Sequence, residues 1–253
     1  MQQEKQPAKV KVGNWVINYE IKFGQGQLGS VYFEEKIKNE VIEMKKVKHP
    51  NLVQIIDGKL VSGNKLFLFM EKCGKQNLAQ ILEEKGPFTE KEAQVIFKNI
   101  VNGYGELYKN NILHRDIKLE NILKQDENYK LADFGLVKIL NLQDQKQITI
   151  YGTPMYQPPE FLVNEKYVDL EEPYKIDIWA IGVVLYKLIE KKFPWDYGDS
   201  QDTFLDNIQH IPIQYEKNVS EDCKDIIQRI LQYDPKDRIS FSEILQHKFY
   251  LQA

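Results

Sequence analysis

Two strings in the middle of the chain decide its fold class. The first is His114-Arg115-Asp116-Ile117-Lys118-Leu119-Glu120-Asn121, and the second, Asp133-Phe134-Gly135, begins twelve residues after Asn121. An isolated aspartate is usually a turn or loop residue without a catalytic role. An aspartate, a lysine and an asparagine at this spacing, followed by a second aspartate before Phe-Gly, instead predict a catalytic loop.

Three further strings follow toward the C-terminus: Gly152-Thr153-Pro154-Met155-Tyr156-Gln157-Pro158-Pro159-Glu160, Asp177-Ile178-Trp179-Ala180-Ile181-Gly182 and Asp234-Pro235-Lys236-Asp237-Arg238. With them, the chain resembles the eukaryotic protein kinases from about Tyr19 to Phe249. Lys118 and the Gly-Thr-Pro-x-Tyr form indicate the Ser/Thr type, while Pro158 stands where the family usually has alanine. The resemblance implies an α+β, bilobal protein-kinase-like fold, with a small β-rich N-lobe, a larger α-helical C-lobe and Mg·ATP in the cleft between them.

The resemblance also implies the roles of four side chains. Asp116 accepts or orients the proton of the substrate hydroxyl, and Lys118 reaches the transferring γ-phosphate. Asn121 and Asp133 supply hard oxygen ligands, which suit a Mg²⁺ ion that bridges the phosphates. We therefore expect catalysis from Asp116, Lys118, Asn121 and Asp133, with ATP and Mg²⁺ as cofactors.

Arginine is scarce, because only Arg115, Arg229 and Arg238 occur among the 34 basic residues. A planar, bidentate donor is expected where the fold needs one. In the family, the arginine at 238 pairs with Glu160, and the one at 115 binds a phosphate on the activation segment. Arg229 matches no such position and is expected at the surface.

Arg115 therefore implies regulation by phosphorylation. Thr149, four residues before Thr153, is the best-placed acceptor, and Tyr151 is a weaker candidate. A phosphate there would order the segment through charge-assisted hydrogen bonds. The aspartate at 177 is expected to orient the catalytic-loop backbone from a buried helix.

A glycine-rich stretch lies near the N-terminus, with Gly24, Gly26 and Gly29 followed by Val31. Glycines after a strand and before a helix would indicate a dinucleotide fold. Here the next residues, Ser30-Val31-Tyr32-Phe33, favour a strand, and the stretch therefore predicts a hairpin lid over phosphates. A glycine-rich surface hairpin without a ligand fits this stretch alone equally well.

The segment Phe67-Leu68-Phe69-Met70-Glu71-Lys72-Cys73 resembles the last N-lobe strand and the hinge. The resemblance implies that Met70 lines the back of the adenine pocket. It also implies that the backbone from Glu71 to Cys73 binds adenine, and that Val31 and Leu123 sandwich the base. For each apolar side chain, an ordinary core position is an equal alternative.

The N-lobe is shorter than the family requires. Only 17 residues separate Val31 from His49, whereas completing one strand and adding another strand and a helix takes roughly 25 residues. Two assignments of the segment between Val31 and His49 remain. In the first, which we favour, 34–48 is a helix with Glu40 at the position of the paired glutamate. In the second, 40–45 is a strand and Lys45 is the ATP lysine, which places Glu43 awkwardly against adenine. Neither supplies both members of the Lys–Glu pair, so the N-lobe is expected to be truncated.

Composition excludes several classes. The 34 basic and 37 acidic residues leave a net charge of -3, which gives no strong field for nucleic acid. Cys73 and Cys223 cannot form a disulfide framework, so we expect a reducing cytoplasmic or nuclear setting. Residues 1–11 lack the apolar region of a signal peptide. The most apolar run, 178–189, is too short to span a membrane and predicts a buried helix.

Local patterns complete the prediction. We expect an N-terminal extension over 1–18 and a kinase-like domain over 19–250, with an N-lobe at 19–72 and a C-lobe at 76–250. A turn at 62–64 separates two strands, at 53–56 and 66–70, and Thr89 with Glu92 forms a capping box that begins a helix. Further helices are predicted at 176–189, 222–231 and 241–246.

The prediction is an ATP-dependent Ser/Thr protein kinase that acts on protein substrates, without membrane insertion and with regulatory partners undefined. The alternative is a pseudokinase or scaffold whose catalysis is impaired because the Lys–Glu pair is incomplete. A dinucleotide-binding oxidoreductase is disfavoured by the strand after Gly29.

Overall fold

The structure, a computed structural model, describes residues 9–12, 15–18, 44–61, 65–140, 147–149, 153–163, 167–169 and 172–253. Its strands are β1 (Lys9–Val12), β2 (Trp15–Asn18), β3 (Ile55–Val61), β4 (Lys65–Met70), β5 (Ile112–Leu113), β6 (Ile122–Gln125), β7 (Asn128–Leu131), β8 (Lys138–Ile139), β9 (Gln147–Thr149) and β10 (Tyr167–Asp169). Its α-helices are α2 (Leu78–Lys85), α3 (Glu90–Lys109), α4 (Pro159–Val163), α5 (Lys175–Glu190), α6 (Gln201–His210), α7 (Glu221–Ile230), α8 (Phe241–Gln246) and α9 (Lys248–Leu251).

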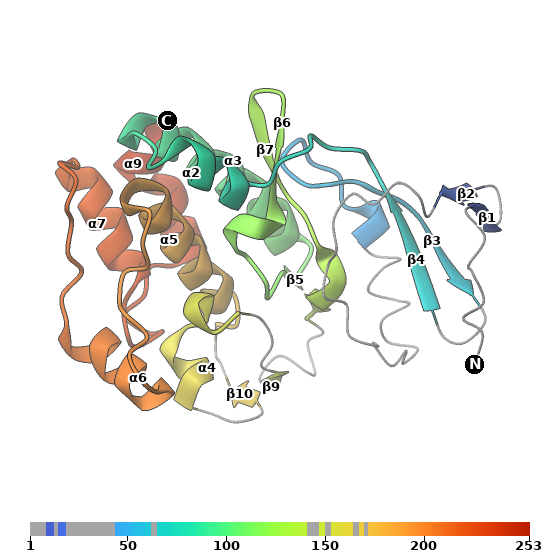
Figure 1. The fold of residues 1–253 in the computed structure, drawn as a ribbon. Helices are drawn as coiled ribbons and strands as arrows, with labels where there is room; N and C mark the ends of the chain where they lie inside the picture. The colour runs from blue at the N-terminus through green and yellow to red at the C-terminus, as the bar shows by residue number, and fades with distance from the viewer. Residues whose placement is uncertain are drawn as a thin grey trace.

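Strands β1 to β4 precede α2 and α3 in the chain, whereas the short strands β5 to β10 lie between α3 and α5. Figure 1 shows β1 to β4 on one side, the labelled helices α2 to α7 and α9 on the other, and the short strands β5 to β7 between them. Within the described residues, the strands form five antiparallel pairs, namely β1 with β2, β3 with β4, β5 with β8, β6 with β7 and β9 with β10. The pair β1–β2 was not predicted; it lies within 1–18, which was expected only to be an N-terminal extension.

The helical part forms around α3 and α5. Thr89 accepts a hydrogen bond from the N–H of Glu92, and the Glu92 side chain accepts one from the N–H of Thr89, so the predicted capping box is confirmed. In α5, every residue except Lys187 is buried. A helix that is apolar on all sides must be covered on all sides, which explains why the run at 178–189 has so little polar character. The helices predicted at 222–231 and 241–246 are α7 and α8.

No α-helix in the described ranges combines the length and the apolar character that crossing a bilayer requires.

The segment before β3 attaches the strand-rich part to the helical part. The N–H of Leu131 in β7 donates to the carbonyl of Asn51 at 2.9 Å, and the N–H of Val53 donates to the carbonyl of Leu131 at 2.8 Å. The Asn51 amide also donates to the carbonyl of Tyr129 at 2.9 Å. Val53 therefore bonds to β7 rather than to β4. The strand β3 begins at Ile55 and continues to Val61, later than the predicted 53–56.

The strand register for Lys45 is wrong. Residues 44–46 are helical. The N–H of Val47, directly after this helix, donates to the carbonyl of Met44 at 3.2 Å, and both side chains are buried. The Lys45 ammonium lies 3.2 Å from Asp57 Oδ1, and its side chain is 49% exposed. The favoured helical register therefore holds for 44–46, and the described residues 47 and 48 lie beyond the end of this helix. Glu40 lies outside the described residues.

Candidate active site

The centre of the site is Asp116, a buried residue whose carboxylate has two close partners. Lys118 Nζ lies 2.8 Å from Asp116 Oδ2. Asn121 Nδ2 lies 2.8 Å from the same oxygen and also donates to the Asp116 carbonyl at 2.8 Å. The short helical turn Leu119–Asn121 brings the amide back toward the aspartate. The ammonium of Lys118 and the amide of Asn121 therefore both lie within hydrogen-bond distance of the Asp116 carboxylate.

A buried carboxylate from α5 holds the backbone of this loop. Asp177 accepts hydrogen bonds from the N–H groups of His114 and Arg115, both at 2.8 Å. Burial raises the pKa of Asp177, and these bonds oppose that rise. Arg115 has φ of 66°, a left-handed conformation that costs about 1–3 kcal/mol in a residue other than glycine. The predicted role of Asp177 is confirmed, since it fixes the strained turn that presents Asp116.

His114 connects this loop to the second string. Its Nδ1 accepts from the N–H of Asp116 at 3.3 Å, so its Nε2 carries the hydrogen that points to the carbonyl of Ala132 at 3.1 Å. Its ring lies 5.6 Å from that of Phe134. The N–H of Ala132 donates to the carbonyl of Asn121 at 2.8 Å. The backbone directly before Asp133 is therefore held against the catalytic loop.

Asp133 itself is exposed and has φ of 61°. Asn121 directs its amide nitrogen at Asp116, so its oxygen is the atom that remains for a cation. Among the residues that the structure describes, no group of three or more His, Cys, Asp or Glu side chains is arranged for a metal. Mg²⁺ is commonly held by one or two protein oxygens together with substrate phosphates, so Asn121 and Asp133 fit this ion.

Thr153 adds a contact that the sequence analysis missed. Its hydroxyl lies 3.3 Å from Lys118 Nζ, so the lysine joins the catalytic loop to the segment after it. The string around Thr153 resembles the kinase family, but a threonine beside a proline does not by itself indicate a contact with the catalytic loop. Only the folded chain brings Thr153 to Lys118, 35 residues away.

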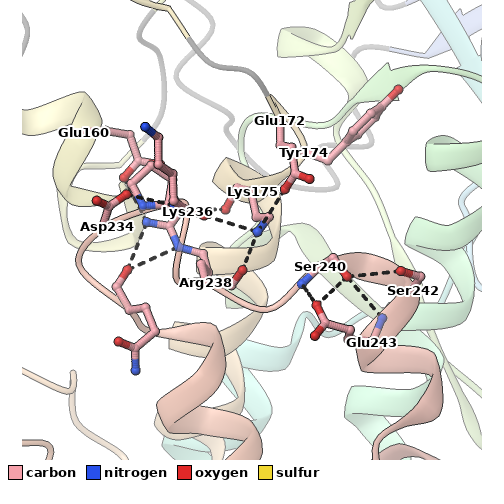
Figure 2. A network of polar contacts seen from close by, with 12 residues as sticks. Glu160, Glu172, Tyr174, Lys175, Asp234, Lys236, Arg238, Ser240, Ser242 and Glu243 are labelled. Carbon is pink, nitrogen blue, oxygen red and sulfur yellow. Dashed lines mark hydrogen bonds and ion pairs between the residues drawn. The ribbon is translucent and has the colours of Figure 1, made fainter.

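The predicted Arg238–Glu160 pair is confirmed, and its glutamate lies in α4. Arg238 Nη1 and Nη2 lie 2.8 Å and 2.9 Å from the two oxygens of Glu160. Figure 2 shows the pair beside Lys175, whose ammonium donates to the carbonyls of Pro235 and Arg238. Arg229 pairs with Glu243 at 3.4 Å at the surface, as expected.

Arg115 contacts the backbone where the activation segment begins. Its Nε donates to the carbonyl of Leu136 at 2.5 Å, and its Nη2 donates to that of Val137 at 3.2 Å. The backbone of Thr149 lies in β9, opposite Tyr167 of β10. Tyr151 lies outside the described residues.

The predicted nucleotide-binding residues are described in part. Met70 is 44% exposed, whereas Cys73 and Leu123 are partly buried against the core. The N–H of Glu71 donates to the carbonyl of Gln54 at 2.9 Å. The Lys45 side chain lies against Asp57 at the surface, so it is not retained as the ATP lysine. The remaining predicted residues lie outside the described ranges, namely Gly24, Gly26, Gly29, Val31 and Glu40.

Comparison with known proteins agrees with this geometry. Residues 21–250 match the family described as the protein kinase domain, and the chain belongs to the eukaryotic Ser/Thr protein kinases. It is 37% identical over 238 residues to myosin light chain kinase A of Dictyostelium discoideum, covering 90% of this chain and 78% of that protein. It is 32% identical over 225 residues to serine/threonine-protein kinase ATG1b of Arabidopsis thaliana, covering 85% of this chain and 30% of that relative. Serine/threonine-protein kinase PLK4 of Drosophila grimshawi is 32% identical over 221 residues, covering 86% of this chain and 28% of that relative. The chain thus spans less than a third of the length of these last two proteins.

Proposed function

We propose that this chain transfers the γ-phosphoryl group of Mg·ATP to serine or threonine hydroxyls of protein substrates. The observation that carries the proposal is the cluster of Asp116, Lys118 and Asn121, in which two partners lie 2.8 Å from one carboxylate oxygen. The proposal includes a two-lobed layout, with the nucleotide between the strand-rich part and the helical part.

In this mechanism, the substrate oxygen forms a bond to the γ-phosphorus while the bond to the bridging oxygen of ADP breaks. Asp116 orients the hydroxyl and accepts its proton. Lys118 lies beside it and stabilises the charge on the transferring group, which in a loose transition state is spread over three oxygens. Asn121 and Asp133 would hold Mg²⁺. This ion supplies charge neutralisation at the phosphates.

Regulation by phosphorylation of Thr149 is part of the proposal. Arg115 already bonds the carbonyls of Leu136 and Val137, so its guanidinium lies where the activation segment begins. A phosphate on Thr149 would add charge-assisted bonds and order the segment. We expect a Thr149→Ala variant to lose most of the activity that prior autophosphorylation gives. Full activity in this variant would remove Thr149 from the proposal. We place this activity in the cytoplasm or nucleus.

A second candidate function is a pseudokinase or scaffold. It is favoured by the shortness of the chain between Val31 and His49 and by Lys45, whose ammonium pairs with Asp57 rather than entering the site. Without a Lys–Glu pair, a truncated N-lobe would align the phosphates poorly, and transfer would fall severely.

One assay separates the two candidates. Transfer from [γ-³²P]ATP to a generic basic protein is measured for the unaltered chain, Asp116→Asn and Asp199→Asn, an exposed aspartate outside the site. We expect a loss of at least about a hundredfold for Asp116→Asn, because the acceptor carboxylate is removed, and no loss for Asp199→Asn. Equal signal from the unaltered chain and Asp116→Asn favours the scaffold.

A further inference from the structure

A lysine on β7 reaches the segment that leaves β4. Lys130 Nζ lies 2.7 Å from Glu71 Oε1, and the two side chains are 13% and 30% exposed. Glu71 directly follows β4 and begins the connection from the strand-rich part to α2. The pair therefore spans two parts of the fold that are 59 residues apart in sequence.

The same carboxylate also holds a third segment. Glu71 Oε1 accepts from the N–H of Gln54 at 2.8 Å, while the N–H of Glu71 donates to the carbonyl of Gln54 at 2.9 Å. One oxygen thus links the residue before β3, the residue after β4 and Lys130 of β7. Adjacent to this point, Leu131 already pairs with Asn51 and Val53.

A surface ion pair would usually contribute little, because water competes for both charges. This pair differs from the surface pairs of the same chain. Lys192 and Glu216, for example, lie 2.5 Å apart with side chains that are 42% and 70% exposed. Around Glu71, the ionised carboxylate makes both bonds charge-assisted, and the lower exposure of the pair makes them more costly to break. Neither the spacing of Lys130 nor its charge singles it out in the sequence.

We propose that the Glu71–Lys130 pair, together with Gln54, fixes residues 71–77 relative to the helical part. These residues, which connect β4 to α2, are called the hinge below, and their position would set the affinity for the nucleotide. Lys130 is a positioning residue, since it acts through Glu71 and has no part in the chemistry. This inference rests on the proposed function only for the identity of the ligand. The mechanical part, which is that the pair restrains 71–77, does not depend on it.

The test uses the full chain and two readouts. Hydrogen exchange of the amides at 71–77 is measured without ligand, and the Kd of Mg·ADP is measured by calorimetry. The variants are Lys130→Met, Lys130→Arg, Glu71→Gln, the double variant Glu71→Gln/Lys130→Met, and Lys192→Met as the matched control. Far-ultraviolet circular dichroism confirms that each variant is folded.

In Lys130→Met we expect hinge exchange to rise and the Kd of Mg·ADP to increase about tenfold, as for loss of a charge-assisted hydrogen bond. Lys130→Arg keeps the charge and should stay within about twofold of the unaltered chain. The double variant should be no worse than Lys130→Met, because both changes remove one interaction.

Hinge exchange that is unchanged in Lys130→Met, or that rises equally in Lys192→Met, would overturn the inference. Strictly additive effects of Glu71→Gln and Lys130→Met would overturn it too. If the unaltered chain binds no Mg·ADP while Lys130→Met still speeds hinge exchange, the proposed function fails and the restraint by the pair is supported.

Discussion

Arg238 and Glu160 form two parallel hydrogen bonds across 78 residues of sequence, at 2.8 Å and 2.9 Å. The arginine side chain is fully buried and that of the glutamate is 10% exposed. The guanidinium also lies 4.9 Å from the ring of Trp179 in α5 and donates to the carbonyl of Lys175 at 2.8 Å. One side chain thus joins α4, α5 and the loop before α8 (Figure 2).

Breaking this pair should strongly destabilise the protein. In Arg238→Met, the buried Glu160 carboxylate loses both hydrogen bonds from the guanidinium, and we expect a loss of about 3–5 kcal/mol in the free energy of unfolding. Arg238→Lys should lose less, since it keeps a charge but not the fork. Urea denaturation measures both. The control is Arg229→Met, whose surface contact with Glu243 should contribute less than about 1 kcal/mol. Equal losses at both positions would contradict the prediction.

Gly103 should tolerate no side chain. A Cβ there would lie 2.5 Å from the carbonyl oxygen of Asn51, which is backbone and already bonded to Leu131. We expect Gly103→Ala to destabilise the protein by about 1–3 kcal/mol through overpacking, despite alanine's better helix propensity. Gly105→Ala on the same helix is the matched control, because its Cβ would meet only the ring edge of Phe241 at 3.1 Å. A larger loss for Gly105→Ala would refute the argument. Thermal and urea unfolding give both values.

Glu92 should make stability depend on acid pH. The hydrogen bond from Lys85, followed by the one from Thr89, lowers the pKa of Glu92 to about 2 from its ordinary 4.5. A lowered folded-state pKa contributes stability that is present above pH 4.5 and is lost as pH falls toward 2.

We therefore expect Glu92→Gln to destabilise the chain at pH 6.5 and by a smaller amount at pH 4. The side chain is 44% exposed, so after solvent screening the effect should be about 1 kcal/mol or less. Urea denaturation at the two pH values checks it. A loss that grows toward pH 4 would have the wrong sign and would contradict the assignment.

The two cysteines should differ in reactivity. Burial raises the pKa of Cys223 to about 12, and its side chain is inaccessible. Burial, and then the charge of Glu71, also raises the pKa of Cys73, but this residue is only partly buried. Because the thiolate is the reactive form, iodoacetamide at pH 8 should label Cys73 slowly and Cys223 only after unfolding. Peptide mass spectrometry with and without urea follows each site, and Cys73→Ser is the control. Labelling of Cys223 first in the native protein would be the opposite of this expectation.

The sequence alone determined the family and the centre of the site. Asp116, Lys118 and Asn121 lie within a few residues of one another, so a local turn is enough to bring their side chains together. The capping box at Thr89 and the apolar run of α5 are also local signals, and they fixed where those helices lie. The pairing of Arg238 with Glu160 followed from the resemblance.

Only the tertiary structure decided how distant segments meet. A charge such as that of Lys130 has the same pattern whether it faces water or Glu71, because strand alternation specifies a face but not the partner across it. Thr153 and Lys118 likewise meet only after α4 and the catalytic loop are packed. The register near Lys45 could not be settled from the sequence, because a short apolar run fits a helix and a strand equally well. The helical backbone of residues 44–46 decided it.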